Sequence, residues 1–251
     1  MISFVGAGPG DVDLITVRGR KLIEAADIVI YAGSLVSAGH LDYCREGCEK
    51  YDSSKMTLEE VIGVMKKGAG EGKDIVRLHT GDPSIYGAVK EQMDRLEELN
   101  IEFEMVPGVS SFTASCAAIK SEFTLPGVSQ TVIMTRLAGR TPVPERESLE
   151  LLASHHSSMA IFLSAGNIDG VVEKLKEGYG RTDVPAAVVY KATWEDQKIV
   201  MGTLADIADK VKAEGIGNFA QILVGDFIDG SYQRSKLYDP SFSHGFREAA
   251  K

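Results

Sequence analysis

The stretch that decides the fold opens the chain, where residues 2–11 read ISFVGAGPGD. Residues 2–5 are mostly apolar and predict a short strand. Three glycines follow at once, and glycine at the end of a strand permits a tight turn. Residues 14–26 then place apolar side chains at helical spacing. The opening therefore predicts a strand, a glycine-rich turn and a helix.

The same unit recurs through the first half of the chain. Strands are expected at 28–31, 75–79 and 102–106, and helices at 57–67, 85–99 and 110–119. Thr57 and Glu60 have the spacing of a capping box at the start of one of these helices. Alternating strands and helices predict a mainly parallel sheet that is covered on both faces.

A second run of elements follows a polar interruption that contains Pro126. Its expected strands and helices are residues 131–135, 160–163, 168–177, 186–190, 199–201, 204–214 and 219–224. We therefore predict an α/β protein of two α/β domains, residues 1–120 and 121–251. A polar and aromatic surface tail is expected after residue 229.

Composition narrows the function classes. The net charge is −9, which disfavours a nucleic-acid partner because phosphate binding needs clustered Lys and Arg. No apolar stretch approaches the roughly 20 residues that span a bilayer, so no membrane association is expected. Three cysteines in a chain of 251 residues favour a reducing compartment, the cytoplasm. Cys44 and Cys48 could supply half a metal site, but no second pair lies nearby, and we predict no metal.

The first turn differs from the fingerprint of redox dinucleotide binding. That fingerprint needs a further glycine where this chain has Asp11, and Pro9 removes a backbone N–H that a phosphate would use. A carboxylate at this place would also repel a pyrophosphate. Dinucleotide binding is therefore disfavoured, and a merely tight turn remains the alternative interpretation.

Two further turns have comparable character. Residues 80–87 read TGDPSIYG after one predicted strand, and residues 107–111 read PGVSS after the next. Both lie at the carboxyl edge of the predicted sheet, where open α/β sheets bind ligands. We expect these turns and residues 6–11 to converge on a single crevice, where small residues let a ligand approach the backbone closely.

Together the three turns resemble those of the tetrapyrrole (corrin and sirohaem pathway) methyltransferases. The order and spacing of GxGPGD, GDP and PG-x-[ST]-[SA] agree, and the resemblance extends over nearly the whole chain. Residues 31–36 (YAGSLV) and 135–144 (TRLAGRTPVP) look most like the members that methylate C11 of precorrin-4 or cobalt-precorrin-4. Ala32 stands where members that methylate uroporphyrinogen usually carry Asp.

The resemblance implies two α/β domains with S-adenosylmethionine in the cleft between them, S-adenosylhomocysteine as the product, and a homodimer. Relatives often carry Met at the position of Leu163 and Gly at that of Ala192. The cofactor contacts that it implies are Pro9, Gly81, Asp82, Ile85, Ser110, Ser111, Leu163 and Ala192. The substrate contacts that it implies in the first turn are Gly8, Gly10 and Asp11.

Methyl transfer from a sulfonium to an electron-rich ring carbon needs alignment and desolvation more than a catalytic group, and we assign no catalytic residue. Asp11 is a candidate to assist deprotonation. Arg136 and Arg140 are predicted to clamp the acetate and propionate groups of the tetrapyrrole. The alternative is a solvated basic loop balanced by neighbouring glutamates, and the role of Arg146 stays open.

Other functions remain as alternatives. The chain could be a sibling methyltransferase that acts at another ring carbon, or on the modified histidine of an elongation factor. A non-catalytic nucleotide-binding module and an NAD-dependent dehydrogenase belong to different classes, and a titration with NAD, ATP and S-adenosylhomocysteine discriminates them. Whether the ring already carries cobalt is also left open by the sequence.

Overall fold

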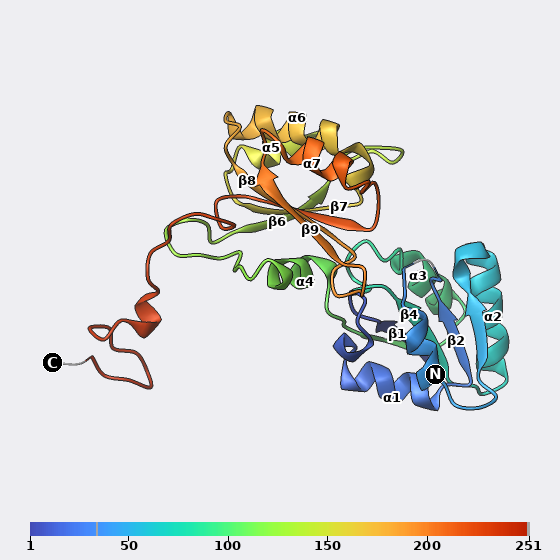
Figure 1. Ribbon diagram of the computed structural model, residues 1–251. Coiled ribbons are helices and arrows are strands. Elements are labelled where there is room, and N and C mark those ends of the chain that lie inside the picture. The colour runs from blue at the N-terminus through green and yellow to red at the C-terminus, as the bar shows by residue number, and fades with distance from the viewer. Residues whose placement is uncertain (34, 250–251) are drawn as a thin grey trace. The chain divides into compact units, whose positions relative to one another are not determined.

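The computed structural model describes residues 1–33 and 35–249, and its chain divides into two compact units. The first unit contains residues 1–114 and 191–197, and the second contains residues 115–190 and 198–251. Each unit is built around one sheet of five strands (Figure 1). The domain boundary expected between residues 120 and 121 stays a prediction, because compact units are not the same as independently folding domains.

The sheet of the first unit is parallel throughout, as the alternation of strands and helices predicts. Its order is β3-β2-β4-β1-β5, and every neighbouring pair is parallel. The strands are β1 (Ile2–Gly6), β2 (Ile28–Tyr31), β3 (Glu49–Asp52), β4 (Ile75–His79) and β5 (Phe103–Val106). β3 was not expected, because its residues, EKYD, contain no apolar run.

Helices cover both faces of this sheet. They are α1 (Val17–Ala25), α2 (Leu58–Gly70) and α3 (Lys90–Glu98). On one face, β-strand side chains pack with Met65 of α2 and Leu96 of α3, and on the other they pack with Ile23 of α1. Figure 1 shows α2 and α3 near β2 and β4. The continuous apolar strands are thus explained by burial on both sides.

Helix boundaries show one informative difference from the sequence. The capping box of α2 is present, with Thr57 and Glu60 bonding each other's backbone N–H. Helix α3, however, begins at Lys90 rather than at residue 85. The intervening residues Tyr86 and Ala88 have φ of 52° and 48°, which no right-handed helix can contain. The helical periodicity of residues 85–99 was therefore misleading over its first turn.

The sheet of the second unit is mixed, whereas the alternation of strands and helices predicts a mainly parallel sheet for the first half only. Its order is β6-β7-β10-β8-β9, and among these pairs β6–β7 is parallel and the other three are antiparallel. Its strands are β6 (Val132–Arg136), β7 (Ser158–Phe162), β8 (Pro185–Tyr190), β9 (Lys198–Thr203) and β10 (Ala220–Val224). A buried strand has the same apolar sequence pattern whether its neighbours are parallel or antiparallel. The apolar runs of the second half therefore could not show in which direction the strands pair.

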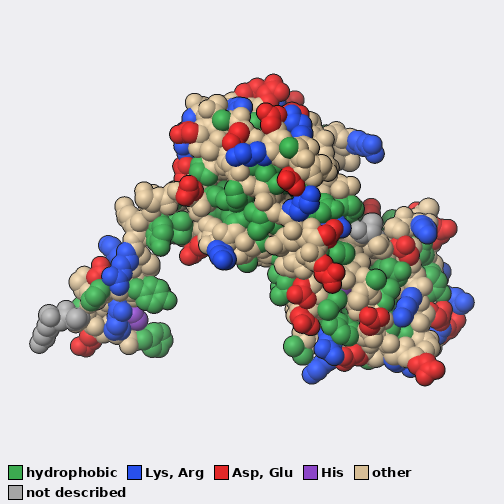
Figure 2. All heavy atoms as spheres, viewed as in Figure 1, with side chains coloured by type: hydrophobic (Ala, Val, Ile, Leu, Met, Phe, Trp, Pro, Cys, Tyr) green, Lys and Arg blue, Asp and Glu red, His purple; other side chains and the backbone are tan. Residues whose placement is uncertain are grey.

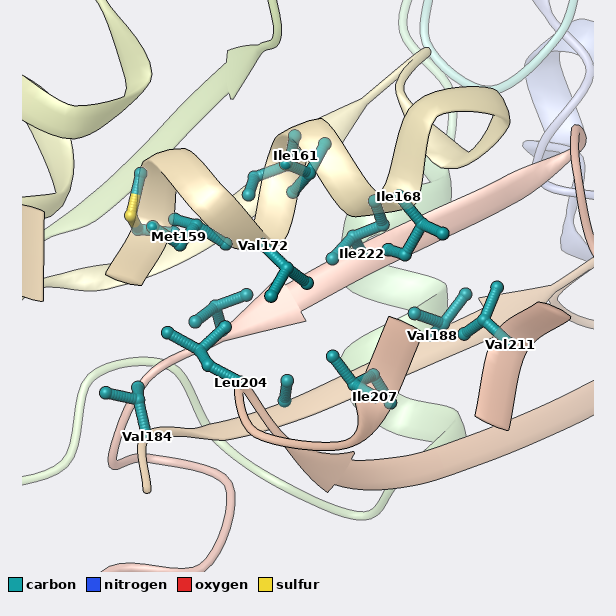
Figure 3. Packing of buried hydrophobic residues seen from close by; sticks show 14 of the residues in the cluster. Met159, Ile161, Ile168, Val172, Val184, Val188, Leu204, Ile207, Val211 and Ile222 are labelled. Carbon is teal, nitrogen blue, oxygen red and sulfur yellow. The ribbon is translucent and has the colours of Figure 1, made fainter. Parts of the chain in front are cut away.

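One face of this sheet carries the core of the second unit. The helices of the unit include α5 (Leu149–Ala153), α6 (Ile168–Tyr179) and α7 (Ile207–Ala213), and α4 (Ser111–Ala118) spans the division between the units. Figure 3 shows Val172, Ile207 and Val211 from the helices packed among Met159, Ile161 and Ile222 from the strands. All six side chains are at least nine-tenths buried.

The C-terminal tail contains one short helical turn, Lys236–Tyr238, and carries exposed aromatic side chains. Tyr232 is 64% exposed and Phe246 is 99% exposed. Figure 2 shows hydrophobic side chains beside charged ones on the tail. Within the described residues no helix combines the length and apolar character that crossing a membrane requires.

Candidate functional site

The three glycine-containing corners meet at one place in the first unit. The backbone of Gly8 pairs with that of Gly81, with N···O distances of 3.3 Å and 2.8 Å in the two directions. The strands before them, β1 and β4, are parallel neighbours, so both corners leave the sheet at its carboxyl edge. β5 flanks β1 on its other side and brings the third corner to the same edge. The three corners therefore meet at one edge of the sheet, as expected, while the crevice expected there stays a prediction.

Glycine is required where these corners touch. A Cβ atom on Gly108 would lie 2.1 Å from the carbonyl oxygen of Gly81 and 2.8 Å from the Cα of Gly6. A Cβ atom on Gly6 would lie 2.6 Å from the Cα of Gly108. No side chain fits between backbones this close, so the first and third corners are locked against the second.

Asp82 fastens the second corner to the third. One carboxylate oxygen accepts a hydrogen bond from the N–H of Gly108 at 2.9 Å, and the other accepts from the N–H of Ser84 at 2.8 Å and from its hydroxyl. Partial burial opposes ionisation, but the hydrogen bonds from Ser84 and Gly108 outweigh it and hold the pKa of Asp82 below its ordinary value. The oxygens predicted to contact a cofactor are therefore used to hold the corners together.

The carboxyl edge of the first sheet carries three carboxylates. Asp11 follows β1, Asp52 ends β3 and Asp82 follows β4. Each accepts a hydrogen bond from a backbone N–H, and Asp52 binds the N–H of Gly33 at 3.0 Å. This edge favours a positively charged ligand over a phosphate. Ser34, which belongs to the motif at 31–36, lies outside the described residues.

Residues 191–197, which connect β8 and β9, belong to the first unit and cover its first corner. The indole N–H of Trp194 donates to the carbonyl of Pro9 at 2.9 Å, and the N–H of Asp11 donates to the hydroxyl of Thr193 at 3.0 Å. A Cβ atom on Gly10 would lie 2.1 Å from the Trp194 ring. Nothing in the sequence indicated that Thr193 and Trp194 hold residues 9–11.

Backbone strain separates structural turns from candidate ligand contacts. Non-glycine residues with positive φ are uncommon, and their simplest use is to end a helix. Asn100, Lys120 and His156 each follow a helix and have this use. Five others instead lie in the loops that follow β4, β7 and β8: Tyr86, Ala88, Leu163, Lys191 and Thr193. Such strain collects at ligand sites, and these loops contain the predicted contacts Ile85, Leu163 and Ala192.

The predicted contacts differ widely in exposure. Leu163 is 76% exposed, although it directly follows a buried strand, whereas Ala192 is 5% exposed. Ser110 is buried and its carbonyl accepts from the N–H of Ala114, so it begins α4. Ile85 is half-buried after the second corner. Leu163 belongs to the second unit and the other three belong to the first.

The two predicted clamp arginines behave differently. The guanidinium of Arg136 donates to the carbonyls of Thr141 at 3.1 Å and Pro142 at 2.7 Å, so it shapes its own loop. Arg140 is exposed, and within the described part of the chain it has no hydrogen bond or ion pair. Arg146 lies 3.8 Å from Glu147, at the distance of a weak surface pair. Arg140 therefore has the side chain available for a substrate carboxylate.

The chain is similar to known proteins over its whole length. The family model described as tetrapyrrole (corrin/porphyrin) methylases matches residues 1–208. A cobalt-precorrin-4 C(11)-methyltransferase of Methanocaldococcus jannaschii is 56% identical over 251 residues, covering 100% of this chain and 97% of that protein. A precorrin-4 C(11)-methyltransferase of a Sinorhizobium species is 44% identical, covering 98% of each chain.

A solved structure agrees with these relatives. The X-ray structure of the cobalamin biosynthetic enzyme cobalt precorrin-4 methyltransferase superposes with a TM-score of 0.89 at 46% identity, covering 91% of this chain and 95% of that one. The resemblance read from the three corners is thereby confirmed, and so is the α/β fold class. The chain belongs to the tetrapyrrole (corrin/porphyrin) methylases.

Proposed function

We propose that this protein transfers a methyl group from S-adenosylmethionine to C11 of precorrin-4 or of its cobalt-bearing form, a step of cobalamin biosynthesis. The observation that carries the proposal is the 56% identity, over the full chain, to a protein with that named activity. The interlocked corners support it, because they lie at the carboxyl edge of a parallel sheet, the place where open α/β sheets bind ligands.

The residues at this edge fit the methyl donor better than a dinucleotide. S-adenosylmethionine carries a sulfonium and an ammonium, and the carboxylates Asp11, Asp52 and Asp82 would attract these charges. A pyrophosphate would meet the same carboxylates and be repelled. When bound, the donor supplies an electrophilic methyl group and leaves as the neutral thioether S-adenosylhomocysteine.

The residues of this chain then serve to hold the methyl donor in place. Pro9, Gly81, Asp82, Ile85, Ser110, Ser111, Leu163 and Ala192 remain our proposed donor contacts. Among them the corner residues are held rigid by the backbone contacts of Gly6, Gly81 and Gly108. A donor bound to a rigid edge loses less entropy in reaching the reactive alignment, and alignment can lower the barrier by roughly 7–11 kcal/mol.

For the tetrapyrrole we propose Gly8, Gly10, Asp11 and the arginines Arg136 and Arg140. Arg140 would bind a peripheral carboxylate directly, whereas Arg136 would act by holding the loop at 137–142 through its carbonyl contacts. Asp11 is exposed and beside Thr193, so it can accept a proton without first being freed from burial. We also propose a homodimer, which the family resemblance implies, in the cytoplasm, which the cysteine content favours.

The decisive experiment is an assay of the purified protein with precorrin-4, cobalt-precorrin-4 and uroporphyrinogen III, each with S-adenosylmethionine labelled at the methyl carbon. We expect one added methyl by mass spectrometry and a new quaternary C11 signal by NMR with one of the first two rings. Methylation of uroporphyrinogen III alone, or label at another carbon, would overturn the proposal. Light scattering of the same preparation tests the dimer.

A further inference from the structure

Strand β4 contains two polar residues in a place that favours apolar ones. Arg77 is 7% exposed and His79 is 5% exposed. Alternation places both on the same face as Ile75, which packs with Phe4 of β1 and Leu96 of α3. The ring of His79 stacks on Phe4, so this side chain is held by packing. Arg77 therefore projects a guanidinium into the apolar layer between the sheet and its helices.

The guanidinium of Arg77 is bound by neutral groups. Its Nε donates to Oε1 of Gln92 at 3.1 Å, and its Nη1 donates to the carbonyls of Ile30 at 3.3 Å and Leu78 at 3.5 Å. Within residues 1–33 and 35–249 no carboxylate lies within ion-pair distance of it. Burial lowers the pKa of Arg77 to about 10, so the group still carries its charge at neutral pH.

A buried charge without a counterion opposes folding, and an apolar side chain of similar size would favour it. Burial, followed by the charge of Arg77, lowers the pKa of His79 to about 3, so His79 stays neutral and adds no second charge. Stability alone therefore gives no reason for a guanidinium here. The hydrogen bonds of the Arg77 guanidinium do suggest a reason, because they connect it to two loops at the carboxyl edge of the sheet.

The first of these paths leads to the strained loop. Gln92 accepts from Arg77 and donates through Nε2 to the carbonyl of Ala88 at 2.9 Å. Ala88 and Tyr86 are both left-handed, and a Cβ atom on Gly87 between them would lie 2.2 Å from the carbonyl of Pro83. Such a conformation persists only where surrounding contacts hold it. Gln92 supplies one of those contacts, and Arg77 fixes which way the Gln92 amide points.

The second path leads to the end of β2. The carbonyl of Ile30 accepts from Arg77, and the chain leaves the sheet one residue later, after Tyr31. One guanidinium thus joins the base of the corner at 31–33 to the base of the loop at 83–89. It does so from the buried side of the sheet, where it cannot touch a ligand at the edge.

We propose that Arg77 and Gln92 are positioning residues for the methyl donor, which hold the carbonyl of Ala88 and thereby keep Tyr86 and Ala88 left-handed and the loop that contains Ile85 in its donor-binding geometry. This rests on the proposed function, since it assigns the donor to the edge that contains Ile85. Neither residue contacts the donor. Both act through the loop.

The test uses Gln92→Glu in the full-length protein. A glutamate still accepts from Arg77 and supplies the missing counterion, but it has no N–H for the carbonyl of Ala88. We expect the free energy of unfolding to stay level or rise, while the dissociation constant for S-adenosylmethionine, measured by calorimetry, increases roughly 5- to 100-fold, the effect of one lost buried hydrogen bond. In the ligand-free variant, amides 86–89 should exchange hydrogen faster than in the wild type.

The matched controls separate positioning from simple loss of a buried glutamine. Gln92→Met loses both contacts, and Gln221→Met loses a buried glutamine that donates to Ile161 in the second unit. We expect Gln92→Met to weaken donor binding and Gln221→Met to leave it unchanged. In assays with ring substrate, the KM for the donor should rise for both Gln92 variants, while kcat at saturating donor changes little.

Two results would overturn the inference: unchanged donor affinity in Gln92→Glu, or affinity losses that follow unfolding free energy equally in all three variants. Failure of the proposed function is distinguishable, because the wild-type protein itself would then bind no S-adenosylmethionine.

Discussion

The carboxyl edge of the first sheet and the carboxyl ends of β6 and β7 in the second sheet differ in how far their polar groups are already hydrogen-bonded. In the first unit, glycine backbones pack directly on one another, and Asp82 is used up in holding the corners. In the second unit, the parallel pair β6–β7 ends in a Leu163 that is left-handed and 76% exposed, beside a loop with exposed Arg140. The hydroxyl of Ser164 accepts from the N–H of Leu137 at 2.9 Å and ties these two ends together.

The difference indicates what each edge is built to do. A corner whose polar groups are already satisfied by its neighbours is rigid before any ligand arrives, which suits the alignment of a small donor. The ends of β6 and β7 carry an exposed apolar side chain and, within residues 1–33 and 35–249, a guanidinium without a hydrogen bond, which is compatible with the carboxylate-rich ligand that we propose. Single substitutions at each of these places test that contrast.

Gly108→Ala should break the first edge. Its Cβ would lie 2.1 Å from the carbonyl of Gly81, and no flexible side chain can move aside. We expect a loss of at least about 3 kcal/mol in the free energy of unfolding, because backbone must shift in a packed layer. Urea denaturation followed by circular dichroism measures this.

Gly63→Ala is the matched control, since a Cβ at this position of α2 meets nothing within 4 Å. It should stabilise the protein by up to about 1 kcal/mol through helix propensity. Equal stabilities for the two alanine variants would show that the corners are not interlocked.

Asp82→Asn should loosen the same edge without a clash. An amide offers one acceptor oxygen, and its NH2 group would face a donor, either Gly108 N–H or Ser84 N–H. We expect about 1–3 kcal/mol less stability and weaker donor binding. Thermal unfolding and calorimetry measure both quantities, with Asp42→Asn, an exposed surface position, as the control.

The pH dependence has a definite sign here. The folded-state pKa of Asp82 is depressed, so its contribution is complete above the ordinary carboxylate pKa and is lost as the pH falls through the folded value. The stability difference between wild type and Asp82→Asn should therefore shrink in acid. A difference that grew in acid would contradict this role.

Arg140→Ala should affect the second edge alone. We expect tetrapyrrole binding to weaken by about 1.5–3 kcal/mol, the range for a hydrogen bond to a charged group, with little change in stability because the side chain is exposed. S-adenosylmethionine affinity should stay unchanged. Lys66→Ala removes the same charge from the exposed face of α2 and controls for overall electrostatics. Equal losses of donor and ring affinity would count against the clamp.

Leu163→Gly should give the smallest change, and in the opposite direction. Glycine adopts positive φ without the steric cost of a Cβ, so stability should rise by up to about 1 kcal/mol despite the greater entropy of the unfolded chain. Leu163→Ala keeps the strain and removes the side chain. If Leu163 contacts the donor, both variants should bind it more weakly, and a glycine variant that binds as tightly as wild type would remove Leu163 from the site.

Most elements of the first half could be predicted because short stretches of sequence specify them. Strand β2 falls where the apolar run at 28–31 predicts it, and the capping box of α2 is formed by Thr57 and Glu60. Helix α3 was extended too far, because periodicity reports which side chains are apolar and not which φ a residue takes. Strand β3 was missed because an edge strand needs no apolar run.

In the candidate site, too, local features could be predicted from the sequence and long-range contacts could not. The corners at 6–11, 80–87 and 107–111 could be found because glycine and proline act on their own neighbours. The contacts of Trp194 with Pro9 and of Arg77 with Gln92 could not, because they join residues that are 185 and 15 positions apart. Nothing in a local pattern distinguishes such partners from ordinary packing residues.

By itself, then, the amino-acid sequence determined the alternation of strands and helices, the three corners and the family to which they belong. The mixed second sheet, the bond of Asp82 to the backbone of Gly108, and the buried guanidinium of Arg77 bound to Gln92 and Ile30 became visible only in the folded chain. The physical reason is that turn chemistry acts within a few residues, whereas strand direction, burial and the partners of a charge depend on which distant segments pack together.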